Sequence, residues 1–137
     1  MRIKTLLAHR YLLVLAIAYT SLIAWLSLAR IFIPVDIKVI ASDKIGHLLA
    51  YFVFTIVWFL FFFYSVKQRK NFLQSLIRAS VFGFLFGVLM EMLQALLTSY
   101  RSPDWYDVLA NSGGIIFAII LLKVLKNKLV SVKGLLT

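Results

Sequence analysis

Four long apolar runs, separated by short polar segments, dominate the pattern of the chain. Crossing the hydrocarbon core of a bilayer takes about 20 helical residues, and each run is close to this length. Every backbone group in lipid must be hydrogen-bonded within the protein, so such continuous runs favour helices over strands. The pattern predicts an all-α, polytopic membrane protein: a four-helix transmembrane bundle with spans at residues 11–29, 45–64, 79–97 and 108–125.

Length and composition agree with this interpretation. The 137 residues suit a single membrane domain over residues 1–137. Hydrophobic residues make up 63% of the chain, against about 45–50% in soluble domains. The chain has no cysteine, which excludes a disulfide framework and a thiolate metal site. The net charge of +10 comes from Lys and Arg that flank the apolar runs, which indicates contact with membrane lipids and not with nucleic acid.

The distribution of Lys and Arg predicts the orientation in the membrane. Eleven of the fifteen basic residues fall near the two termini and in the connection at 65–78, and four fall in the other two connections. Cytoplasmic segments carry the excess of Lys and Arg, so both termini are predicted to be cytoplasmic in a bacterial cytoplasmic membrane. The first apolar run is longer than the ~7–15 residues of a signal-peptide core, which favours an uncleaved first span.

All five acidic residues lie in or near the outer half of the predicted bundle. Asp43, His47 and Tyr51 are four residues apart and share one face where the second span begins. Glu91 and Gln94 are three residues apart in the third span, with Glu91 about 10 Å below its outer end. A lone ionisable side chain in lipid costs at least about 2.5–3.5 kcal/mol on insertion scales. These groups are therefore expected to face one another or water.

Small residues accompany the polar ones in the third and fourth spans. Gly83 and Gly87 lie on the same face as Glu91, and their spacing is a close-packing motif of membrane helices. This face of the third span is therefore expected to be buried in the bundle. The fourth span has one face on which polar residues give way to small ones: Asp107, Asn111, Gly114 and Ala118.

Three polar segments together resemble the motifs of the VanZ-like family. They are Asp43-Lys44-Ile45-Gly46-His47 with Tyr51, Gly87-xxx-Glu91-Met92-Leu93-Gln94, and Arg101-xx-Asp104-xx-Asp107-xxx-Asn111-xx-Gly114. The family takes its name from an accessory protein of bacterial glycopeptide resistance that is associated with teicoplanin. The resemblance implies a small polytopic protein of the cell envelope and a link to glycopeptide susceptibility.

The functional hypothesis is an outward-facing polar site that recognises or modifies a lipid-linked or cell-envelope substrate. His47 could shuttle a proton while Glu91 or Asp107 orients it, and these three are the candidate catalytic residues. Arg101 and Lys44 could hold a phosphate or a carboxylate of the substrate. The complete set of candidate substrate-binding residues is Asp43, Lys44, Tyr51, Gln94, Arg101, Asp104 and Asn111.

Three alternatives stay open. His47 with Glu91, Asp104 or Asp107 would make an oxygen-rich site for a divalent ion, but the two-histidine signature of a zinc protease helix is missing, and no metal ligand or cofactor is assigned. The same residues could bind membrane lipids, a lipid-linked cell-wall precursor or a lipoglycopeptide without catalysis. The cluster could also be structural, since interhelical polar contacts hold membrane helices together at about 0.6 kcal/mol each. The sequence leaves the oligomeric state open.

Overall fold

The computed structural model describes residues 3–28, 40–65, 71–97 and 104–136. These residues form α1 (Ile3–Leu28), α2 (Ile40–Tyr64), α3 (Phe72–Leu97), α4 (Trp105–Val124) and α5 (Lys126–Leu136). The described segments contain no strand, so the all-α prediction is confirmed. Four of the helices are long and apolar enough to cross a membrane, over His9–Leu28, Asp43–Tyr64, Phe72–Leu97 and Trp105–Val124.

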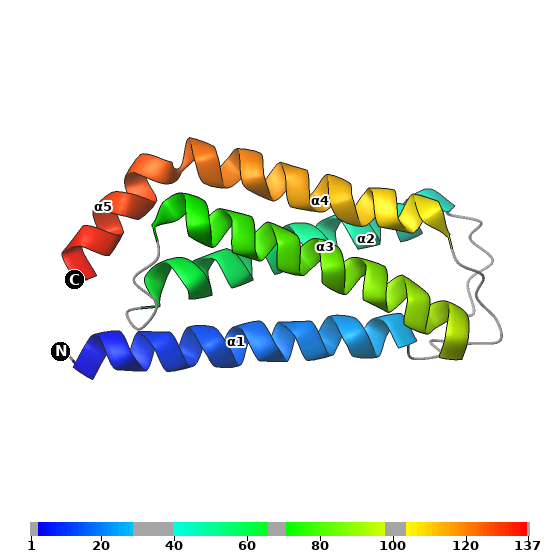
Figure 1. Ribbon diagram of the computed structural model, residues 1–137, viewed down its shortest axis with the longest axis horizontal. Helices are drawn as coiled ribbons and strands as arrows, with labels where there is room; N and C mark the ends of the chain where they lie inside the picture. The colour runs from blue at the N-terminus through cyan, green and yellow to red at the C-terminus, as the bar shows by residue number, and fades with distance from the viewer. Residues whose placement is uncertain (1–2, 29–39, 66–70, 98–103, 137) are drawn as a thin grey trace.

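The helices α1 to α4 lie side by side in an elongated bundle (Figure 1). The start of α1 and the end of α5 lie at the same end of this bundle, as an even number of spans requires (Figure 1). Within it, α2 packs most extensively against α4 and also contacts α3 and α1. Large apolar side chains remain exposed along all four long helices, for example Leu15, Leu49, Leu85 and Ile116. Such an exposed apolar surface suits contact with lipid.

The third helix begins at Phe72, earlier than the predicted residue 79. Asn71 explains the early start, because its side-chain oxygen accepts a hydrogen bond from the backbone N–H of Gln74 at 2.8 Å. The side chain of Gln74 in turn accepts from the Asn71 backbone N–H at 3.4 Å, which completes a reciprocal cap. Arg78, which the sequence placed in the connection, consequently lies within α3.

The fifth helix was not predicted, because its short, lysine-rich sequence reads as a polar tail. Leu125 separates it from α4, and the backbone N–H of Leu125 still bonds the carbonyl oxygen of Leu121 at 3.0 Å. The hydroxyl of Tyr64 at the end of α2 donates to the Leu129 carbonyl oxygen at 3.2 Å. Leu129 also packs on a buried aromatic cluster formed by Phe59, Phe63, Phe72, Leu76, Ala79 and Leu122. These contacts hold α5 against the end of the bundle.

Gly114 of α4 lies close against the backbone of α2. A Cβ atom there would clash with the carbonyl oxygen of Leu48 and would lie 2.8 Å from the backbone nitrogen of Phe52, both on α2. Gly87 of α3 is also tightly packed, since its Cβ would lie 3.1 Å from the Tyr51 ring. The predicted burial of the face that carries Gly83, Gly87 and Glu91 is confirmed. The backbone contact at Gly114 brings α2 and α4 together below the polar residues.

Candidate functional site

Three helices bring their polar residues together at the end of the bundle opposite the chain termini (Figure 1). The first turns of α2 and α4 and the last turns of α3 meet there, because α2 and α4 run with their starts at this end and α3 finishes there. Glu91, Gln94, Asp107 and Asn111 are all buried. Polar groups that were separated along the chain therefore share one partly enclosed region.

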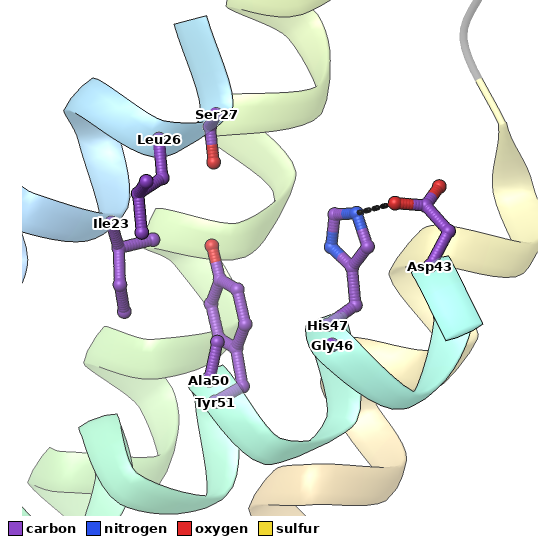
Figure 2. Close-up of a pocket in the computed structure, with 8 residues that line it drawn as sticks. All are labelled: Ile23, Leu26, Ser27, Asp43, Gly46, His47, Ala50 and Tyr51. Carbon is purple, nitrogen blue, oxygen red and sulfur yellow. Dashed lines mark ion pairs between the residues drawn. The ribbon is translucent and has the colours of Figure 1, made fainter. Parts of the chain in front are cut away.

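His47 lies at the centre of this region. Its Nδ1 atom is 3.1 Å from the side-chain oxygen of Asn111 and 4.0 Å from a carboxylate oxygen of Glu91. Its Nε2 atom is 3.7 Å from Asp107 and 4.0 Å from Asp43, an ion pair drawn in Figure 2. The predicted proximity of His47, Glu91 and Asp107 is thus confirmed as geometry, while their catalytic roles stay predictions. We call these residues, His47, Asp43, Glu91, Asp107 and Asn111, the His47 cluster.

Lys44 joins the starts of α2 and α4. Its Nζ atom is 2.5 Å from a carboxylate oxygen of Asp104 and 2.5 Å from one of Asp107. Asp104 is also the N-cap of α4, where its side chain accepts a hydrogen bond from the Tyr106 backbone N–H at 2.9 Å. The hydrogen bond from Lys44, followed by that from Tyr106, lowers the pKa of the Asp104 carboxyl. Lys44 was predicted to hold a substrate anion, but in this arrangement its ammonium lies between two carboxylates of the protein.

A cavity of about 360 Å³ opens beside His47 between α1 and α2 (Figure 2). The Tyr51 side chain is buried, and its hydroxyl points into this space together with the Ser27 hydroxyl (Figure 2). In the segments that the structure describes, the Tyr51 hydroxyl has no hydrogen-bond partner. Ser27 and Gly46 line the cavity but were not predicted as site residues. For Ser27 the one available signal was a polar residue at the end of an apolar run.

Gln94 lies at the edge of the site. Its amide nitrogen donates to the Ser27 carbonyl oxygen at 2.9 Å, which ties the end of α3 to the end of α1. The substrate-binding role predicted for Gln94 therefore stays untested, whereas a structural role is directly visible. Arg101 lies outside the described residues, so its predicted part in the site also stays a prediction.

A second cleft, of about 350 Å³, lies between α3 and α4. Glu91 and Asp104 supply its polar lining, and the remaining lining residues are apolar: Val88, Met92, Ala95, Leu96, Trp105 and Val108. Trp105 is largely exposed and was not predicted as a site residue. Glu91 thus belongs to the His47 cluster and also lines an apolar space between two spans.

The donor set could also hold a metal ion. Ligand atoms of Asp43, His47 and Asp107 lie within 4.8 Å of one another, and one nitrogen with two oxygens suits a hard or borderline divalent ion. One oxygen of Asp107 is already bonded to Lys44, so an ion would compete with that ammonium. The sequence had considered Glu91, Asp104 or Asp107 beside His47, and the geometry groups Asp107 and Asp43 with it.

Comparison with known proteins gives the family. No curated protein and no solved structure matches the chain. A family model described as VanZ/LLP1 matches residues 5–126, which include all the candidate site residues. Four spans of sufficient length and the resemblance of the polar motifs agree with this match. The chain is a multi-pass membrane protein and belongs to the VanZ/LLP1 family.

Proposed function

We propose that this protein recognises a lipid-linked cell-envelope substrate at the His47 cluster and that His47 exchanges a proton with the polar group of that substrate. The observation that carries the proposal is the position of Glu91, which is part of the His47 cluster and also lines the apolar cleft between α3 and α4. A lipid-linked molecule could keep its hydrocarbon in such a cleft while its polar group reaches the cluster.

The contacts of His47 suit proton transfer. Asn111 orients the ring through Nδ1, and the carboxylates of Asp107 and Asp43 face Nε2. In this proposal His47 accepts a proton from a substrate hydroxyl or amine, and the neighbouring carboxylates stabilise the charge that develops on the ring. The Tyr51 hydroxyl, which points into the adjoining cavity, would donate a hydrogen bond to the substrate.

The balance of charge in the site limits which polar groups the substrate can carry. Among the described residues the site has four carboxylates, Asp43, Glu91, Asp104 and Asp107, against the ammonium of Lys44 and the imidazole of His47. This excess favours hydroxyl and amine groups, which donate hydrogen bonds, over an unaccompanied phosphate. A phosphate on the substrate would need a further cation, and Arg101 is our candidate.

The alternative is a non-catalytic protein that binds a lipid or a drug and whose polar cluster is structural. The contacts of Lys44 with Asp104 and Asp107 favour it, because the ammonium at the site is already bonded within the protein and joins α2 to α4. Either version could alter susceptibility to a teicoplanin-type glycopeptide, by modifying an envelope component or by retaining the lipoglycopeptide itself.

His47→Gln and Glu91→Gln distinguish the two versions. Each keeps a polar side chain of similar shape and removes the capacity to exchange a proton. The assay is survival under a teicoplanin-type glycopeptide of a susceptible bacterial host that makes the protein. Catalysis predicts that both variants insert normally and lose protection, and that the double variant is no worse than either single one, because residues that act as a unit are non-additive.

The control is His9→Gln, which changes the only other histidine. His9 stacks on Phe61 at a ring distance of 5.2 Å, in the half of the bundle that holds the termini, so protection should remain. Wild-type survival with both His47→Gln and Glu91→Gln would refute the shared site. Partial loss that higher expression restores would favour the non-catalytic binder.

We further propose that the protein lies in the bacterial cytoplasmic membrane with both termini in the cytoplasm, which places the His47 cluster at the outer face. The excess of Lys and Arg near the termini supports this. Because the chain has no cysteine, single introduced cysteines can be labelled to determine on which side of the membrane each segment lies. Ser99→Cys, between α3 and α4, should react with an impermeant maleimide in intact cells, and Ser131→Cys, exposed on α5, should not. The reverse labelling pattern would place the cluster on the cytoplasmic side.

A further inference from the structure

Besides the two cavities near the His47 cluster, a third lies at the other end of the bundle, where the chain termini are. It has a volume of about 750 Å³ and is enclosed by the end of α2, the start of α3, the end of α4 and α5. We call it the terminal groove. Its lining is apolar and aromatic apart from one asparagine and three lysines: Phe63, Asn71, Phe72, Leu73, Leu76, Lys123, Lys126, Val130 and Lys133.

We propose that the terminal groove binds an anionic phospholipid, with the phosphate held by the lysines and an acyl chain lying along the apolar floor. This site is separate from the His47 cluster and does not depend on the function proposed above.

The positions of two lysines in the groove are the first observation that supports phosphate binding. The Nζ atom of Lys133 lies 4.3 Å from the centre of the Phe63 ring, and that of Lys126 lies 5.8 Å from the centre of the Phe72 ring. The two rings are themselves in edge contact, with centres 5.8 Å apart. The two ammonium groups therefore lie over neighbouring rings that contact each other, and in our proposal a single phosphate approaches both of them.

The charge of the segments that line the groove is the second observation that supports binding of an anion. The sequence has no Asp or Glu in residues 44–90 or 108–137, which supply the whole lining of the groove. All five acidic residues belong to other parts of the chain. Burial also lowers the pKa of Lys133, because an ammonium loses hydration there. In our proposal an anionic headgroup in the groove stabilises the charged form of this lysine.

Depth in the membrane identifies the kind of anion. The α3 span starts at Phe72 and the α4 span ends at Val124, so the groove lies where the spans leave the hydrocarbon. Phospholipid headgroups occupy this level, and basic pockets between membrane helices bind anionic headgroups. The apolar floor, formed by Phe63, Phe72 and Leu76, offers an acyl chain a surface that a soluble phosphate would not use.

The test uses the full chain in nanodiscs that contain equal amounts of phosphatidylglycerol and phosphatidylcholine with the same acyl chains. Native mass spectrometry then compares the lipids that stay bound. We expect the wild type to retain phosphatidylglycerol preferentially. Lys126→Gln and Lys133→Gln should each lower this preference about fivefold, which corresponds to about 1 kcal/mol per lysine.

Two further variants separate a defined site from general surface charge. Lys128 is exposed on α5 and does not line the groove, so Lys128→Gln should change the preference less than twofold, by roughly 0.4 kcal/mol or less. Val130→Trp fills the groove without changing the charge and should lower retention of phosphatidylglycerol. Equal retention of both lipids by the wild type would overturn the proposal. So would an equal effect of Lys128→Gln, or unchanged retention with Val130→Trp.

Discussion

The two ends of this bundle are held together by opposite kinds of chemistry. At the His47 cluster, helices meet through ion pairs and hydrogen bonds, such as those of Lys44 with Asp104 and Asp107. At the terminal end they meet through edge-on rings, with the ring centre of Phe72 on α3 5.1 Å from that of Phe59 and 5.8 Å from that of Phe63 on α2. Lipid is as apolar as a leucine side chain, so burial alone does not drive helices together in a membrane.

This difference indicates what each end contributes. Ring packing depends on shape and tolerates many apolar side chains of similar volume. Charged groups require a particular partner at a particular distance, because a buried charge without one is costly. The terminal end can therefore supply general cohesion, while the polar end sets the register of α2 against α4 and, in our proposal, carries the chemistry.

Gly114→Ala is the substitution expected to disturb this arrangement most. Its Cβ would meet the backbone of Leu48 and Phe52, which cannot turn aside as a side chain could, so α2 and α4 must separate. We expect a loss of about 3 kcal/mol or more in the free energy of unfolding, at the upper end of overpacking effects. SDS titration in mixed micelles measures it. Gly113→Ala is the matched control, since its nearest neighbour is a Leu48 side-chain carbon at 3.7 Å. Equal loss from both variants would contradict the assigned close contact.

Phe59→Ala tests the cohesion of the aromatic end. Phe59 is completely buried, and the cavity left by its ring should cost about 3 kcal/mol in the free energy of unfolding. Phe84→Ala makes the same change at a side chain that is 48% exposed on the lipid-facing surface, where lipid can fill the space. If both variants lose the same stability, packing at the aromatic end does not provide the cohesion described here.

Lys44→Met tests the polar end by removing the ammonium between two carboxylates. We expect a loss of about 1–2 kcal/mol at neutral pH, because hydrogen bonds to charged groups are lost at a partly exposed position. Lys128→Met, on the exposed side of α5, should have little effect. The bond from Lys44 holds the pKa of Asp104 below its ordinary value of 3.8. The wild type should therefore lose this stabilisation as the pH falls below 3.8, and Lys44→Met should lose less over that range.

The smallest expected effect concerns the helix caps at the two ends. Asn71 caps α3 at the terminal end with a neutral side chain, whereas the charged Asp104 caps α4 at the polar end. Asn71→Ala should cost about 1 kcal/mol in the free energy of unfolding, and Asn71→Asp, which retains the acceptor, should cost much less. Equal losses from the two variants would show that the side-chain acceptor does not stabilise the start of α3.

Much of the fold could be predicted from the local pattern. Continuous apolar runs indicate spans because the requirement for internal hydrogen bonds in lipid applies to each run separately. The four-residue spacing from Asp43 to His47 and Tyr51 places them on one face for the same local reason. The start of α3 and the whole of α5 were missed, because they depend on the cap at Asn71 and on the contacts of Leu129 with other helices.

The sequence by itself determined that the protein is a bundle of four membrane helices with its acidic residues concentrated near one end. Only the tertiary structure decided which of these groups meet. Lys44 reaches Asp107 and His47 reaches Asn111 across more than 60 residues of chain, and Gln94 turns toward Ser27 on α1. Helical periodicity fixes the face on which a side chain lies, but the helix that this face meets depends on the rotation and spacing of neighbouring helices. Close contacts such as that of Gly114 with the α2 backbone set this rotation and spacing, and such contacts exist only in the assembled bundle.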